Sequence, residues 1–144
     1  MADEDAVFTE LLGSMNAGAV LEIGCGDGEF TEVLVERLGA WAGIEATDAA
    51  ADAVREAREY FAKAHPEAPV SFRKADAAAL PYPDARFDTV VLSNAVHHFA
   101  EPVAALSEAV RVLRPDGRIV VNEMVSDVEE PRRQVGRDLH HFKA

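Results

Sequence analysis

The stretch Val20-Leu21-Glu22-Ile23-Gly24-Cys25-Gly26-Asp27-Gly28 decides the fold class of this chain. An apolar strand leads into three alternate glycines, and apolar residues at helical spacing follow over 30–38. Gly24 permits a sharp turn, Gly26 lets a ligand approach the backbone, and Gly28 lets the next helix start close to the sheet. The stretch therefore predicts a strand–loop–helix unit that binds a ligand at its loop.

The spacing of the glycines and the nearby acids indicate which ligand. Because residue 29 is Glu, the pattern is GxGxG, whereas a dinucleotide fingerprint has GxGxxG. Glu22 and Asp27 place negative charge beside the loop, which disfavours a pyrophosphate and suits a cofactor with a sulfonium and an ammonium. Glu45 lies near the end of the expected second strand, where a carboxylate can accept both ribose hydroxyls. An ordinary βα turn and a surface acid are the alternative interpretations.

Strand-like and helix-like runs alternate outward from this loop, which predicts a single α/β domain over residues 1–144 with a mainly parallel sheet. We expect strands over 19–23, 41–46, 70–72, 87–93 and 118–124, and helices over 5–15, 30–38, 102–113 and 129–143. A further helix is capped by Thr47 or Asp48 and ends at His65. In the helix over 102–113, the residues expected to face inward are Val103, Leu106, Val110 and Leu113.

Composition and charge narrow the classes of function. The chain has 144 residues, 49% of them hydrophobic, which suffices for a core. No apolar run could span a membrane, and the acidic N-terminus does not resemble a signal peptide, so we expect a cytoplasmic protein without a membrane partner. The net charge of -12 disfavours nucleic acid as a partner, and suits either ordinary solubility or high salt. The single cysteine, Cys25, excludes an intrachain disulfide.

Five blocks of the sequence resemble, in order, the class I S-adenosylmethionine-dependent methyltransferases of the type 11 group, which includes the ubiquinone- and menaquinone-biosynthesis methyltransferases. The blocks are residues 20–28, 43–45, 74–83, 87–98 and 111–118. Glu45 stands where the family often has Asp, and Asp116 replaces a usual Gly. The resemblance covers roughly residues 17–125 and implies a three-layer, Rossmann-like open sheet with strand order 3-2-1-4-5.

The resemblance also assigns site residues. It implies S-adenosyl-L-methionine as cofactor and S-adenosyl-L-homocysteine as product. The residues it places against the cofactor are Glu22, Gly24, Cys25, Gly26 and Gly28 at the methionine end, Glu45 and Ala46 at the ribose, Asp76 and Ala77 at the adenine, and Asn94 near the methyl group.

Methyl transfer mainly requires that the acceptor be held close and aligned, with a general base only if the acceptor must lose a proton. His98 and Asn94 are the candidate catalytic residues, beside the expected methyl group. We expect no metal site, since His140 and His141 are adjacent and would point apart on a helix. The expected partner is a small-molecule methyl acceptor. A non-catalytic module of the same fold and an NAD-dependent oxidoreductase are the alternatives.

One departure from the family is large. The family's sheet has an antiparallel hairpin after the fifth strand, and we expect this hairpin to be absent because the chain ends at Ala144. The strand over 118–124 would then be an open apolar edge, which is a liability. We expect a C-terminal helix or a second copy, in a homodimer, to cover it; a truncated chain is the alternative.

Overall fold

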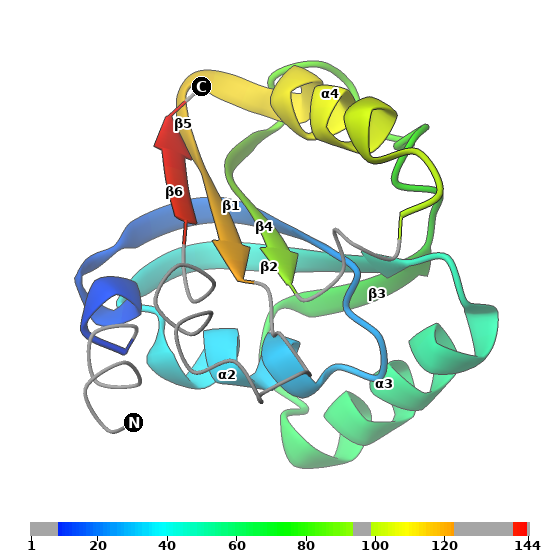
Figure 1. Ribbon diagram of the computed structural model, residues 1–144. Coiled ribbons are helices and arrows are strands. Elements are labelled where there is room, and N and C mark those ends of the chain that lie inside the picture. Colours follow the sequence, from blue (N-terminus) through cyan, green and yellow to red (C-terminus); the bar gives the residue numbers. More distant parts are fainter. Residues whose placement is uncertain (1–8, 94–98, 123–139, 144) are drawn as a thin grey trace, which may run out of the picture.

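A computed structural model describes residues 9–93, 99–122 and 140–143, and its centre is a six-stranded sheet in the order β3-β2-β1-β4-β5-β6 (Figure 1). The first five strands pair in parallel, in the predicted order 3-2-1-4-5, and β6 pairs antiparallel with β5. The strands are β1 (Asn16–Ile23), β2 (Ala40–Asp48), β3 (Val70–Lys74), β4 (Phe87–Ser93), β5 (Leu113–Asn122) and β6 (His140–Lys143).

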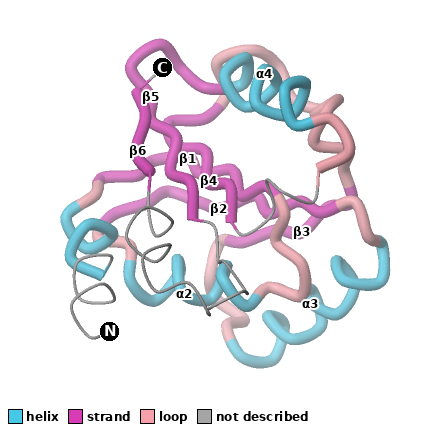
Figure 2. The backbone as a smooth tube through the Cα atoms, in the orientation of Figure 1, coloured by secondary structure: helices cyan, strands magenta, loops and turns pink. Residues whose placement is uncertain are grey.

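Helices cover both faces of the sheet, as a parallel sheet requires. They are α2 (Glu29–Arg37), α3 (Ala51–Ala64) and α4 (Pro102–Val112), and residues 9–14 are also helical. Figure 1 shows α2 and α3 on one face and α4 on the other, and the tube in Figure 2 shows the same three layers. The three-layer α/β prediction is therefore confirmed. In the part of the chain that the structure describes, no helix is long and apolar enough to cross a membrane.

Each face of the sheet has its own apolar core, because successive side chains of a strand point to opposite faces. Along β1, Val20 packs into the core under α2 and α3, while Leu21 and Ile23 pack into the core under α4. The first core also takes Leu12 from residues 9–14 and Phe61 from α3. The same alternation directs Glu22 toward the face of the sheet that α2 covers.

The orientation of α4 differs from the prediction. Val103, Leu106 and Val110 are 78%, 39% and 50% exposed, and the residues of this helix that are buried are Ala105, Ala109 and Val112. Both sets recur at helical spacing, so periodicity alone cannot choose between them. Contacts from Glu108 and Arg111 to residues 80–84 accompany the observed orientation. Of the four residues predicted to face inward, Leu113 alone is buried, as the first residue of β5.

The C-terminal end also differs from the prediction. Residues 140–143 are a strand, so the predicted helix over 129–143 is wrong at its end; the rest of it lies outside the described residues. Main-chain pairing of β6 with residues 118–121 covers the β5 edge that the sequence left open. The argument for a homodimer through an open β5 edge therefore no longer holds, and the homodimer remains untested.

Candidate functional site

The glycine loop joins β1 to α2 and is held against the end of β2. Gly24, Gly26 and Gly28 have φ angles of 87°, 55° and 95°, the left-handed region in which glycine is favoured. The Gly24 and Cys25 amides donate to the Thr47 carbonyl at 2.9 Å, and the Gly26 amide donates to Asp48 Oδ2 at 2.8 Å. The loop is therefore anchored by β2 as well as by its own strand.

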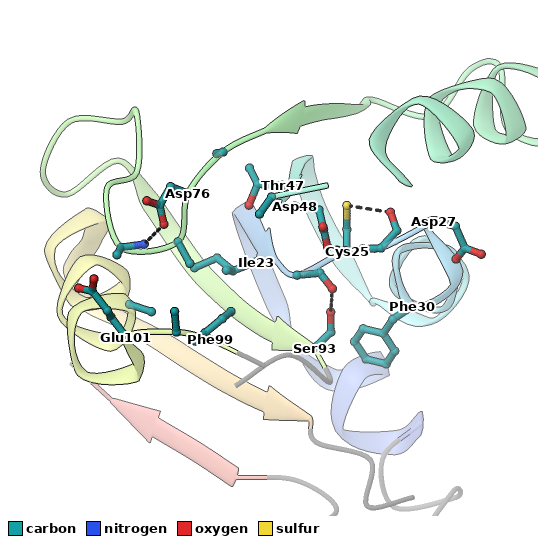
Figure 3. A pocket seen from close by; sticks show the side chains of 18 of the residues that line it. Ile23, Cys25, Asp27, Phe30, Thr47, Asp48, Asp76, Ser93, Phe99 and Glu101 are labelled. Carbon is teal, nitrogen blue, oxygen red and sulfur yellow. Dashed lines mark hydrogen bonds between the residues drawn. The ribbon is translucent and has the colours of Figure 1, made fainter. Parts of the chain in front are cut away.

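A cavity of about 680 Å³ opens at the carboxyl ends of the parallel strands, beside this loop. Ligands of open α/β sheets bind at this edge. Figure 3 shows side chains from the glycine loop, the end of β2, the segment after β3, and both ends of the β4–α4 connection converging on it. Gly26 borders the open space, since a Cβ built on it would meet no protein atom within 4 Å. Substituents at this position would thus enter the cavity.

The charged residues that the structure describes in the lining of the cavity have one sign. All are acids: Asp27, Glu29, Asp48, Asp76 and Glu101. None of the lining residues within the described ranges is Lys, Arg or His. Such a lining repels the phosphates of a dinucleotide and attracts a cation. The site therefore fits a cofactor with a sulfonium and an ammonium, as the acids near the loop predicted.

Several predicted cofactor residues do come together at this cavity. Gly24, Cys25 and Gly26 line it from one side, and Asp76 and Ala77 line it from the segment after β3. Asp76 Oδ1 accepts a hydrogen bond from the Ala78 amide at 2.9 Å, which fixes the carboxylate in a short turn (Figure 3).

The predicted ribose acid, Glu45, is not brought to the cavity. Its carboxylate lies 3.0 Å from Arg86 Nη2, and Glu45 borders a separate depression on the amino-terminal side of β2. The physical reason is the length of β2, which runs three residues beyond Glu45 and ends at Asp48. Asp48 lines the cavity instead, with Oδ2 on Gly26 and Oδ1 accepting from the Ala50 amide at 2.9 Å. Sequence reasoning treated Asp48 only as a possible helix cap.

Three other predicted cofactor residues are not among the residues that line the cavity. Ala46 is fully buried in the core under α2 and α3. Gly28 precedes α2, and a Cβ there would come within 3.2 Å of Ala57 and 3.3 Å of Phe61. The missing side chain thus lets α2 start close against α3, not against the sheet as predicted. Glu22 is completely buried under the loop.

The candidate catalytic residues Asn94 and His98 lie outside the described residues, so their roles stay predictions. The residues on either side of that segment, Ser93 and Phe99, both line the cavity. Sequence reasoning missed these two, together with Phe30 and Glu101. Their positions in the sequence could have indicated them, because they lie next to predicted strand ends and helix starts. In an α/β sheet, side chains at these positions reach the edge where ligands bind.

Cys25 has the environment of a packing residue. Burial, the largest cause, and the nearby charge of Glu22 and Asp48 raise the pKa of the Cys25 thiol far above its usual value. A thiol that stays protonated is a poor nucleophile. Cys25 is therefore not a candidate nucleophile of this site.

A surface cluster joins α2 to α3. Glu32 Oε2 accepts from Tyr60 at 2.7 Å and lies 2.7 Å from His65 Nε2, and these two contacts lower the pKa of Glu32. Ligand atoms of Glu32, Glu36 and His65 lie within 4.8 Å of one another, a spacing compatible with a metal ion. Glu32 and His65 are hydrogen-bonded to each other, so their closeness does not require a metal ion. The expectation of no metal site stays a prediction.

Comparison with known proteins adds independent findings. A family model described as a methyltransferase domain matches residues 21–121. A ubiquinone/menaquinone biosynthesis C-methyltransferase of Hydrogenovibrio crunogenus is 30% identical over 133 residues, 92% of this chain and 52% of the relative. A 27-O-demethylrifamycin SV methyltransferase of Amycolatopsis mediterranei is 34% identical over 74% of this chain and 38% of the relative. The chain thus spans about half or less of these curated relatives.

Solved structures show the same fold. The crystal structure of the YcgJ protein from Bacillus subtilis superposes with a TM-score of 0.72 at 26% identity, covering 92% of this chain and 54% of that one. A methyltransferase from Aquifex aeolicus, described as SAM-dependent, gives a TM-score of 0.74 at 23% identity, covering 89% of this chain and 67% of that one.

Proposed function

Because the chain belongs to the class I S-adenosylmethionine-dependent methyltransferase family, we propose that it binds S-adenosylmethionine in this cavity and transfers the methyl group to a small-molecule acceptor. The observation that carries the proposal is the cavity at the glycine loop, where the charged lining residues that the structure describes are all acidic. Its volume of about 680 Å³ lies within the range of small-molecule sites.

The cofactor would be held by residues from three parts of the chain. The two oxygens of Asp48, at the end of β2, would accept the ribose hydroxyls, a role that the sequence had assigned to Glu45. Asp76 and Ala77 would border the adenine. The backbone around Gly24 and Gly26 would face the methionine end, where no Cβ obstructs approach at Gly26.

When bound, S-adenosylmethionine supplies a methyl group already activated by a positively charged sulfur. The residues of the chain then have to hold the acceptor in line and exclude water. Phe30 and Phe99 supply apolar wall, and in Figure 3 their side chains lie on either side of Ser93. Such a wall suits an apolar acceptor. His98 and Asn94 remain the candidates for contact with the reacting groups.

The names of the relatives include both C- and O-methyl transfer, so the acceptor atom is left open by similarity. We propose a small, apolar acceptor with a nucleophilic carbon or hydroxyl. Turnover is tested by following S-adenosylhomocysteine formation with a panel of demethylquinones and phenols. Formation above the acceptor-free rate supports catalysis, whereas tight cofactor binding without any turnover across the panel would favour the non-catalytic alternative.

The assignment of Asp48 is tested with a matched pair of substitutions on one strand. We expect Asp48→Asn to weaken S-adenosylmethionine binding about ten- to a hundredfold, because it replaces a charged acceptor of hydrogen bonds. Glu45→Gln should leave affinity within about twofold, since Glu45 faces Arg86 outside the cavity. Isothermal titration calorimetry measures both, with NAD as the competing cofactor. A loss of affinity confined to Glu45→Gln would show that Glu45, and not Asp48, binds the ribose.

A further inference from the structure

The Glu22 carboxyl group is completely buried directly beneath the glycine loop, with 0% of the residue exposed. Hydroxyl groups from two other elements hold it there. Thr31 of α2 donates to Oε1 at 2.5 Å, and Ser93 of β4 donates to Oε2 at 2.6 Å. A carboxyl at the end of β1 is thus fixed by the helix that follows the loop and by the neighbouring strand.

No cation balances this carboxyl among the described residues that interact with it. Besides the two hydroxyls, the charged group that acts on it is Asp48 of β2, which has the same sign, and its neighbour in the loop is the neutral Cys25 thiol. Burial is the largest cause that raises the pKa of Glu22, to about 7; Asp48 raises it further, and the bonds from Ser93 and Thr31 oppose the shift. Glu22 therefore exchanges its proton near neutral pH.

Ser93 connects this buried group to the cavity. Its side chain lines the cavity and lies 3.4 Å from the Gly24 carbonyl (Figure 3). The same hydroxyl donates to Glu22. A single hydroxyl therefore separates the carboxyl from the space where a ligand would lie. Because a charge acts more strongly on a group that is buried away from solvent, a positive charge in the cavity favours ionised Glu22.

We propose that binding of S-adenosylmethionine is coupled to release of a proton from Glu22 to solvent, with Ser93 and Thr31 as positioning residues for the carboxylate. This inference rests on the proposed cofactor. S-adenosylmethionine carries one more positive charge than S-adenosylhomocysteine, so the product ionises Glu22 less. By linkage, the affinity for the cofactor rises with pH and that for the product rises less. Discrimination between cofactor and product therefore improves as pH increases.

The experiment is isothermal titration calorimetry of the full chain with each ligand from pH 6 to pH 8, in buffers of different ionisation enthalpy. We expect S-adenosylmethionine affinity to rise about tenfold over this range, the change expected when one group that titrates near pH 7 must lose its proton. Near pH 7 about half a proton should be released per cofactor bound. The rise and the proton release should both be smaller for S-adenosylhomocysteine.

Three substitutions locate the titrating group. Glu22→Gln should flatten the pH profile while the cofactor still binds. Ser93→Ala and Thr31→Val each remove a hydrogen bond that lowers the pKa of Glu22, so each should move the midpoint of the profile to higher pH. Glu101→Gln is the control, because it removes a lining acid that has no contact with Glu22 and should leave the midpoint unchanged.

The outcomes separate this inference from the proposed function. If neither ligand binds at any pH, the proposed function fails. If both bind and Glu22→Gln keeps the wild-type pH dependence, another group such as His98 titrates and the inference is overturned. If Glu22→Gln does not fold, the inference is still overturned when the midpoint is unshifted in both Ser93→Ala and Thr31→Val.

Discussion

The two faces of the sheet are built differently. Under α2 and α3, large side chains such as Leu34 and Phe61 pack against the strands, and the Phe61 ring contacts the Phe72 ring with centroids 4.9 Å apart and planes tilted by 60°. Under α4, the helix faces the core through Ala105, Ala109 and Val112, while three of its larger apolar residues, Val103, Leu106 and Val110, are exposed. The comparison teaches that an apolar stripe marks the buried face of a helix only where long-range contacts do not favour another face.

Small residues allow α4 to lie close to the sheet, and polar contacts accompany its orientation. Glu108 Oε1 accepts from the Leu80 amide at 2.8 Å, and Arg111 donates to Glu108 at 2.7 Å and to Asp84 at 2.8 Å. The Arg111 guanidinium, the larger cause, and the Leu80 amide lower the pKa of Glu108. These contacts connect α4 to the segment before β4, which no periodicity within the helix could reveal.

The largest effect is expected on the α2/α3 face. Phe61→Ala should lower the free energy of unfolding by about 3–5 kcal/mol, because it leaves a cavity between α3 and β3 next to Gly28. Urea denaturation measures the loss. As a control on the other face, Val110→Ala should cost about 0.5 kcal/mol or less, since Val110 is half exposed. Equal losses for both substitutions would contradict the difference between the faces.

An intermediate effect is expected from enlarging the contact of α4 with the sheet. Ala109→Val should destabilise the protein by about 1–3 kcal/mol, because two added methyl groups overfill a fully buried position. Ser107→Val, at an exposed position of the same helix, controls for the lower helix propensity of valine. If thermal unfolding midpoints fell equally in both variants, close packing at Ala109 would not be the cause.

The smallest effect is expected at the residue that the sequence placed in the core. Val103→Ser should change the free energy of unfolding by no more than about 0.5 kcal/mol, because the side chain is mostly exposed. Val112→Ser, at a fully buried position of the same helix, should cost several times more. A large loss in Val103→Ser with a small one in Val112→Ser would restore the predicted orientation of α4.

In the candidate site, as in α4, the sequence placed some residues correctly and misplaced others. Gly24, Gly26 and Asp76 were predicted to contact the cofactor, and they line the cavity because each lies within three residues of the end of a strand at the same edge of the sheet. Glu45 was placed there because the second strand was expected to end at residue 46. The strand continues to Asp48, so the carboxylate that reaches the edge belongs to a different residue. Strand length depends on pairing with neighbours, and in a mainly apolar stretch the sequence marks it poorly.

The sequence by itself determined the α/β class, the five parallel strands and the glycine loop, because these follow from alternating apolar runs and from the positive φ angles that favour glycine. Tertiary structure decided which side of α4 is buried, that residues 140–143 pair with β5, and that Asp48 rather than Glu45 reaches the cavity. The first group depends on neighbours along the chain. The second depends on contacts between residues far apart in sequence, which local pattern does not encode.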